Sequence, residues 1–178
     1  MDKIIFDLLH SVAGSSTLFD QLIVFCAVTL PYFLIIISLI FIYKQKSFRS
    51  KILTLLFLSF AVLFGRGFIT EIINYFYNRS RPFEVLSFEP LISGLGGYSF
   101  PSGHVVLLFT ISFSIFYLNR GFGIWFLGLS ILNGFARVIA GVHWPVDFLG
   151  GIVIAFISFL VSKYLILKNR PIISKSNF

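Results

Sequence analysis

The sequence predicts an all-α protein, a polytopic membrane helical bundle of about five transmembrane helices preceded by a helix that lies in the membrane interface. Composition is the first reason: 57% of the 178 residues are hydrophobic and only 12% are charged, whereas about a quarter of the residues of a globular protein are charged. A soluble fold cannot bury that much apolar surface. The second reason is that apolar runs long enough to cross a hydrocarbon layer of about 30 Å recur along the chain. The length favours a single membrane-embedded domain, residues 1–178.

The N-terminal segment, residues 2–13, is predicted to form the interfacial helix. Its apolar residues recur at helical spacing: Ile5, Leu8, Leu9 and Val12. The first span is predicted at residues 22–43, because this run has 22 residues without a charge. Pro31 lies inside that run and is expected to kink the helix, which membrane spans tolerate because neighbouring groups bond the freed carbonyl.

Four further spans are predicted at 52–77, 102–117, 121–140 and 145–167. The second of the five spans is interrupted by Arg66 and Glu71. The last contains Gly150-Gly151, which allows close approach to another helix.

The distribution of charge predicts the orientation, since lysine and arginine mark cytoplasmic loops. The basic residues after the first and third spans and near the C-terminus are Lys44, Lys46, Arg49, Lys51, Arg120, Lys163, Lys168, Arg170 and Lys175. The acidic residues fall at the opposite ends of the spans: Asp2, Asp7, Asp20, Glu71, Glu84, Glu89 and Asp147. We therefore expect a multi-pass protein of the cell membrane with its N-terminus outside and its C-terminus in the cytoplasm. The net charge of +7 thus reports topology and does not indicate a nucleic-acid partner.

Three short polar blocks stand at the predicted outer ends of the spans. They are Arg81-Pro82, then Pro101-Ser102-Gly103-His104, and then Arg137 with His143 and Asp147. Between the first two blocks lies the loop 83–100, whose 18 residues exceed a typical connection and favour a lid or an entrance.

The second block begins the third predicted span. Ser102 is a good helix N-cap, and the free backbone N–H groups of a helix N-terminus attract anions. Gly103 lets a phosphate approach the backbone because it has no Cβ. A helix cap alone does not account for His104, and an ionisable residue at the end of an apolar span indicates function.

The third block supplies a histidine and a carboxylate four residues apart. If the fifth helix has begun by His143, Asp147 lies on the same face, accepts the imidazole N–H and leaves the other ring nitrogen free to attack. The alternative is a plain pair of residues at a helix start. Arg81 and Arg137 are candidate phosphate ligands, since a guanidinium pairs two oxygens at once, and Arg79 is a further candidate.

In combination the blocks resemble the type 2 phosphatidic acid phosphatase superfamily, whose three motifs are K-x6-R-P, PSGH and S-R-x5-H-x3-D. The resemblance implies a lipid phosphatase in which His143 attacks phosphorus to give a phosphohistidine and Asp147 orients it. It implies that His104 protonates the leaving oxygen and then activates water. The phosphate is then held by Arg81, Arg137, Ser102 and Gly103. The resemblance requires no metal and no cofactor, and the three histidines of the chain make no metal-ligand cluster, with His10 a plain interfacial residue.

Two positions depart from the family motifs. Asn74 replaces the lysine of the first motif, and Ala136 replaces the serine of the third. Asn74 and Arg79 are therefore added as candidates for the phosphate site, with Arg79 close enough in sequence to compensate for the lost cation. Arg66 lies two helical turns deeper, about 12 Å away at 1.5 Å per residue. It is expected to pair with another helix or to extend to the interface instead of replacing the lysine.

Within the superfamily, the bacterial undecaprenyl-diphosphatases associated with bacitracin resistance share the missing lysine, the chain size and the interfacial helix. The leading expectation is therefore an outward-facing phosphatase of undecaprenyl diphosphate. Hydrolysis of phosphatidic acid or phosphatidylglycerophosphate is the alternative. A non-catalytic lipid-phosphate-binding membrane protein is the alternative of another class, and Asn74 alone favours it. A soluble vanadate haloperoxidase is excluded by five spans, and a transporter by the absence of an inverted repeat.

Overall fold

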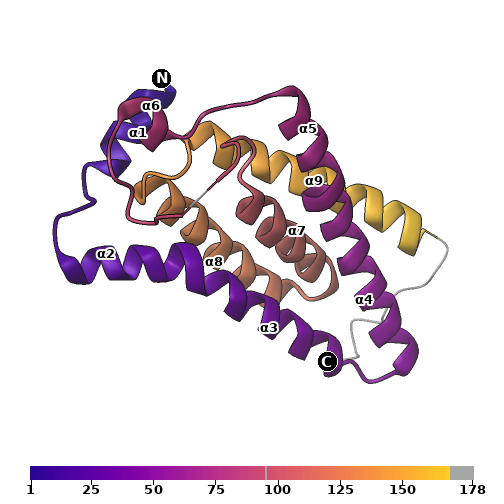
Figure 1. Cartoon of the computed structure of the whole chain (residues 1–178). Helices are drawn as coiled ribbons and strands as arrows, with labels where there is room; N and C mark the ends of the chain where they lie inside the picture. Colours follow the sequence, from indigo (N-terminus) through magenta and orange to yellow (C-terminus); the bar gives the residue numbers. More distant parts are fainter. Residues whose placement is uncertain (95, 169–178) are drawn as a thin grey trace.

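The computed structural model describes residues 1–94 and 96–168, and every regular element in these two ranges is a helix. Its centre is α7 (Gly103–Leu118), which packs against α8 (Arg120–Ile139), α9 (Pro145–Leu167) and α4 (Phe48–Val62), as Figure 1 shows. Nine residues of α7 are buried, which suits an apolar helix surrounded by other apolar helices. Arg170 and Lys175, which entered the charge argument, lie outside the described residues.

Four helices are long and apolar enough to cross a membrane, and the shorter apolar helix α7 completes the bundle. The four are Thr17–Tyr43, Phe48–Phe76, Arg120–Ile139 and Pro145–Leu167. The all-α membrane fold class is confirmed, and the predicted span positions agree within a few residues. The fifth span begins at Pro145 as expected, because proline at the first helical position lacks only an N–H that would be unpaired there.

The first long helix contains a π-helical turn that the sequence analysis did not predict. It consists of α2 (Thr17–Val24), the π-helix η1 (Phe25–Thr29) and α3 (Leu30–Tyr43). Pro31 has no N–H to offer the carbonyl of Ala27 four residues earlier. That carbonyl instead accepts hydrogen bonds from Asn133 Nδ2 and Arg137 Nη1, each at 3.2 Å. The proline therefore exposes an acceptor inside the bundle, and this acceptor anchors one of the motif arginines.

The second long helix also contains a π-helical segment. It consists of α4, η2 (Leu63–Ile69) and α5 (Thr70–Phe76). Thr70 Oγ1 donates to the Gly65 carbonyl at 2.9 Å, across five residues. Gly65 lies so close to α9 that an added Cβ would approach Ser158 Oγ to 2.5 Å. The widened turn thus forms where the helix presses against its neighbour, and π-turns often occur at functional sites.

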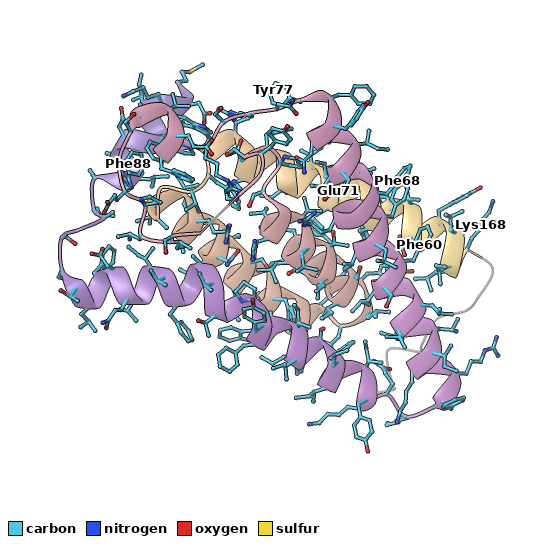
Figure 2. The ribbon with its side chains drawn as sticks, viewed as in Figure 1. Phe60, Phe68, Glu71, Tyr77, Phe88 and Lys168 are labelled. Atoms are coloured by element: carbon cyan, nitrogen blue, oxygen red, sulfur yellow. The ribbon has the colours of Figure 1, made fainter. Side chains whose placement is uncertain are left out.

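The N-terminal helix α1 (Asp2–His10) is shorter than the predicted 2–13 and packs on the ends of α8 and α9. Phe6 is 1% exposed and its ring lies 5.1 Å from that of Trp144. Figure 2 shows Phe88 beside this helix, where its ring stacks near Phe6 and His10. His10 Nδ1 lies 2.7 Å from the Ile139 carbonyl. The expectation of a plain interfacial histidine was therefore wrong, because His10 bonds α1 to the bundle.

The chain folds so that the polar segments meet at one end of the bundle. The segment that contains α6 (Pro82–Leu86) runs from the end of α5 to the start of α7, and the α8–α9 connection lies beside it, at the same end as α1 (Figure 1). Backbone bonds join them, from Leu91 N to Ala140 O at 3.1 Å and from Ser102 N to Asp147 O at 3.2 Å. The α3–α4 and α7–α8 turns lie at the other end.

Candidate active site

His143 lies in the short connection before α9, not on the helix. The helix begins only at Pro145, so His143 and Asp147 do not share a helix face as expected. They are nevertheless neighbours, with His143 Nδ1 3.5 Å from Asp147 Oδ2. The closer partner of Nδ1 is the Ser99 carbonyl at 2.9 Å. A carbonyl can only accept, so Nδ1 carries the proton and the lone pair lies on Nε2.

Two factors keep His143 neutral. Burial is the main cause that lowers its pKa to about 4, and the charges of Arg137 and Arg81 act in the same direction. The hydrogen bond and charge of Asp147 oppose them. Because the ring is unprotonated at neutral pH, its Nε2 is chemically a nucleophile.

Asp147 is fully buried, and its carboxylate accepts three hydrogen bonds. Its Oδ2 accepts from the Trp144 N–H at 2.8 Å and from the Ser99 hydroxyl, and its Oδ1 accepts from Arg79 Nη1 at 2.8 Å. One carboxylate therefore caps α9, ties the loop before α7 to that helix, and faces His143. Such a constrained group can fix the position of the imidazole.

Arg79 joins this carboxylate to the N-terminal helix. Its two terminal nitrogens bond to Asp147 and to Asp2, and Asp2 Oδ1 also accepts from Val146 N at 3.1 Å. Burial lowers the pKa of Arg79, but its two carboxylate partners outweigh burial and raise it. The Arg79 guanidinium also lies 5.4 Å from the Trp144 ring. Arg79 thus holds the loop together, with its terminal nitrogens engaged by carboxylates.

Arg81 is buried and its guanidinium bonds to backbone carbonyls. Nε and Nη2 donate to the loop residues Gly97, Gly96 and Tyr98, and Nη1 donates to Val142 at 3.0 Å. Burial lowers its pKa. Arg81 therefore links the loop before α7 to the α8–α9 connection, and four of its five N–H groups are engaged.

Arg137 stands directly beside the imidazole. Its Nη2 lies 3.4 Å from His143 Nε2, and its Nη1 bonds to the Ala27 carbonyl. The side chain is 3% exposed, and its Nε has no hydrogen-bond partner among the described residues. A buried cation at the lone pair of Nε2 can hold an oxygen of a group that this nitrogen attacks.

The PSGH block caps α7 next to these groups. Ser102 is the N-cap and is fully buried, yet its Oγ has no partner within the described part of the chain. His104 follows in the first turn of α7, where the charges of Arg137, Arg66 and Arg81 act on it. The fold therefore brings together the predicted residues Ser102, Gly103, His104, Arg137, His143 and Asp147.

Arg66 is a site residue that the sequence analysis misjudged. A Cβ added to Gly103 would lie 2.4 Å from Arg66 Nε, so this guanidinium rests on the first residue of α7. The sequence analysis expected Arg66 to pair with another helix or to extend to the interface, and it did not predict this contact with the start of α7. Arg66 Nη1 pairs with Glu71 at 2.8 Å, and Glu71 lies near the start of α5 (Figure 2). Arg66 and Glu71 are five residues apart, the spacing that a π-turn brings together, and this spacing was the sequence signal for their ion pair.

Two more residues were missed, and the predicted residue Asn74 lines a cleft. Ser99 and Asp2 bond to the network above, and nothing in their sequence surroundings indicates it. Asn74 lines a cleft of about 580 Å³ between α5 and the loop before α7, and its Oδ1 is buried without a partner among the described residues. In residues 1–94 and 96–168, no three His, Cys, Asp or Glu side chains gather into a group that could hold a metal ion.

The sequence profile of the PAP2 superfamily matches residues 55–171, which include all three polar blocks. The chain belongs to the PAP2 superfamily. Undecaprenyl-diphosphatase BcrC of Bacillus subtilis is 30% identical over 159 residues, which cover 88% of this chain and 80% of that relative. The family assignment confirms the predicted resemblance.

Solved structures agree with this PAP2 fold. The crystal structure of Aquifex aeolicus LpxE matches with a TM-score of 0.75 and 24% identity, over 90% of this chain and 93% of LpxE. A transmembrane PAP2-type phosphatidylglycerolphosphate phosphatase from Bacillus subtilis matches with a TM-score of 0.69 and 20% identity, over 96% and 86%. This PAP2 protein is thus a multi-pass membrane lipid phosphatase, so the non-catalytic alternative is not supported.

Proposed function

We propose that this PAP2 phosphatase hydrolyses undecaprenyl diphosphate to undecaprenyl phosphate and inorganic phosphate through a phosphohistidine at His143. The observation that carries the mechanism is the hydrogen bond from His143 Nδ1 to the Ser99 carbonyl, which leaves Nε2 unprotonated, with Arg137 Nη2 3.4 Å from it. A neutral imidazole oriented by one nitrogen and open at the other is suited to nucleophilic attack.

In the first step, His143 Nε2 forms a bond to the terminal phosphorus, and the bond from that phosphorus to the bridging oxygen breaks. His104 donates a proton to the departing oxygen. The Ser102 hydroxyl, the Gly103 N–H and Arg137 hold the transferring phosphoryl oxygens. The unpartnered Ser102 Oγ and Arg137 Nε support this assignment, since buried polar atoms are rarely left without a partner.

In the second step, His104 removes a proton from water, the water oxygen bonds to phosphorus, and the phosphorus–Nε2 bond breaks. His143 returns to its neutral form and inorganic phosphate leaves. Asp147, 3.5 Å from Nδ1, stabilises the positive charge of the ring while the phosphohistidine exists.

The substrate assignment is supported by the named relative at 30% identity, an undecaprenyl-diphosphatase. Phosphatidylglycerophosphate and phosphatidic acid are the alternatives, and the structural neighbour that acts on a phosphatidylglycerol phosphate is only 20% identical. Purified protein in detergent containing a chelator is expected to release phosphate fastest from undecaprenyl diphosphate. A higher kcat/KM on either glycerophospholipid would overturn the substrate assignment.

His143→Ala tests the mechanism. It is expected to abolish release from every lipid and to abolish an acid-labile phosphoenzyme that the wild type forms with labelled substrate. Lys44→Ala, at the opposite end of the bundle, is the control for handling and folding. Wild-type rates in the histidine variant would contradict the proposed nucleophile.

We further infer that the site faces the extracytoplasmic side. Lys44, Arg49 and Arg120 lie at the end of the bundle away from His143, which supports a cytoplasmic position for that end. In a Cys26→Ser background, an impermeant thiol reagent added to intact cells should label Asn78→Cys and not Lys44→Cys. The reverse pattern would refute the orientation.

A further inference from the structure

Arg66 differs from the other arginines near the site in how its N–H groups are used. Arg79 is held between two carboxylates, Arg81 by four carbonyl bonds, and Arg137 by Ala27 and His143. Among residues 1–94 and 96–168, Arg66 bonds through Nη1 alone, in an ion pair with Glu71; the two side chains are 44% and 61% exposed. Such an exposed pair is worth at most about 1 kcal/mol, so Arg66 can bind a stronger anion.

The position of Arg66 fits a ligand at the mouth of the site. Its guanidinium lies on Gly103, where the free N–H groups of α7 begin, and its charge acts on His104. Because Gly103 has no Cβ, the Arg66 guanidinium can pack directly against its backbone, where an added Cβ would clash with it. Ser102 beside it contributes a buried hydroxyl that has no partner in the described part of the chain, a second sign that an anion belongs here.

The two cations of the site differ in depth. Arg137 is 3% exposed and touches His143 Nε2, so it serves the phosphoryl group that this nitrogen attacks. Arg66 is 44% exposed and lies on Gly103, the residue before His104, the group assigned to the departing oxygen. A cation at this position faces the substrate group bonded to the transferring phosphoryl group, on the side away from His143 Nε2.

We propose that Arg66 binds the inner phosphate of a lipid diphosphate, the group that departs with the lipid, and thereby makes the enzyme select diphosphates over monophosphates. This inference rests on the proposed function. As the bridging bond breaks, negative charge develops on the departing phosphate, and a guanidinium there stabilises it. A lipid monophosphate has no phosphate at this position and gains nothing from Arg66.

The test compares the diphosphate and the monophosphate of one polyprenyl tail, with Arg66→Gln and the control Arg120→Gln, which removes the same charge at the far end of the bundle. Arg66→Gln is expected to lower kcat/KM for the diphosphate by about 10- to 100-fold, the effect of one charge-assisted hydrogen bond. The rate on the monophosphate is expected to change less than about threefold, and the control is expected to match the wild type on both. Equal losses on the two substrates, or no loss on either, would overturn the proposal.

A second measurement separates this inference from the proposed function. Inorganic pyrophosphate and inorganic phosphate are compared as competitive inhibitors of monophosphate hydrolysis, which needs no turnover of a diphosphate lipid. Wild type should bind pyrophosphate more tightly, and Arg66→Gln should remove that preference while Arg66→Lys keeps part of it. An unchanged preference in Arg66→Gln would refute the role of Arg66, whereas failure of the wild type on undecaprenyl diphosphate alone would refute the substrate.

Discussion

Asp2→Asn should slow this phosphatase although Asp2 lies far from the motifs in sequence and is not assigned a substrate contact. The Asp2 carboxylate accepts hydrogen bonds from Arg79 and from the Val146 N–H, and Arg79 donates a second hydrogen bond to Asp147. Asparagine keeps the size and one acceptor oxygen but removes the charge. The variant therefore tests whether the N-terminal helix is part of the catalytic arrangement.

The magnitude follows from the two bonds and their partial burial. A hydrogen bond to a charged group contributes about 1.5–3 kcal/mol, and the 22% exposure of both Asp2 and Arg79 reduces this to about 1–2 kcal/mol. If that free energy positions Asp147 against His143, kcat falls by about tenfold, since 1.4 kcal/mol equals a factor of ten. KM should change little. Removal of a nearby negative charge should also move the acid limb of kcat, which His143 sets, to lower pH.

The assay is phosphate release against substrate concentration and pH for the wild type, Asp2→Asn and Asp7→Asn. Asp7 is the matched control because it lies on the same helix and pairs only with Lys3, at an exposed position. Wild-type kcat in Asp2→Asn would refute the reasoning. A fall in kcat of the same size in Asp7→Asn would also refute it, because the effect would then belong to the helix as a whole.

Two further predictions concern stability. Because the pKa of His143 is about 4 in the folded protein and near 6.5 when unfolded, the unfolded chain binds the proton first as the pH falls. The contribution of neutral His143 to the free energy of unfolding is fully present above pH 6.5 and is lost towards pH 4, by up to about 3 kcal/mol. The Tm in detergent should therefore fall over this pH range, and it should fall less in His143→Gln. Equal slopes of Tm against pH in the two proteins would contradict this prediction. On α8, Gly134→Ala should destabilise by about 1–3 kcal/mol, because its Cβ would lie 2.2 Å from the Phe148 ring. Gly128 has open space around it, so Gly128→Ala should leave the Tm unchanged or raise it, because alanine has the higher helix propensity. Equal Tm values for the two variants would refute the packing argument.

The spans and the motif residues were predictable because each depends on local chemistry. A membrane helix needs about twenty apolar residues in a row, and the run from 22 to 43 meets this by itself. Pro145 suits the first position of a helix, so the start of α9 could be placed, and the predicted N-cap Ser102 does precede α7, although its hydroxyl makes no capping bond. The π-turn η1 could not, since its free carbonyl is stabilised by Asn133, 106 residues later.

The roles of the arginines were the least predictable part. From the sequence, Arg81 and Arg137 are the candidate phosphate ligands, Arg79 is a further candidate, and Arg66 is remote. In the fold, Arg79 donates a hydrogen bond to Asp2, 77 residues away, and Arg81 donates one to the Val142 carbonyl, 61 residues away. Arg66 lies next to Gly103 because η2 packs against α7, and no local sequence pattern in either segment predicts that packing.

The sequence by itself thus determined a multi-pass helical phosphatase and the identity of its motif residues, because hydropathy and helix starts are properties of neighbouring residues. Only the tertiary structure decided which nitrogen of His143 is free and which arginines still have N–H groups for a ligand. Both depend on carbonyls and carboxylates contributed by distant segments, such as Ser99, 44 residues before His143. Hydrogen-bond partners of this kind exist only once the helices have packed.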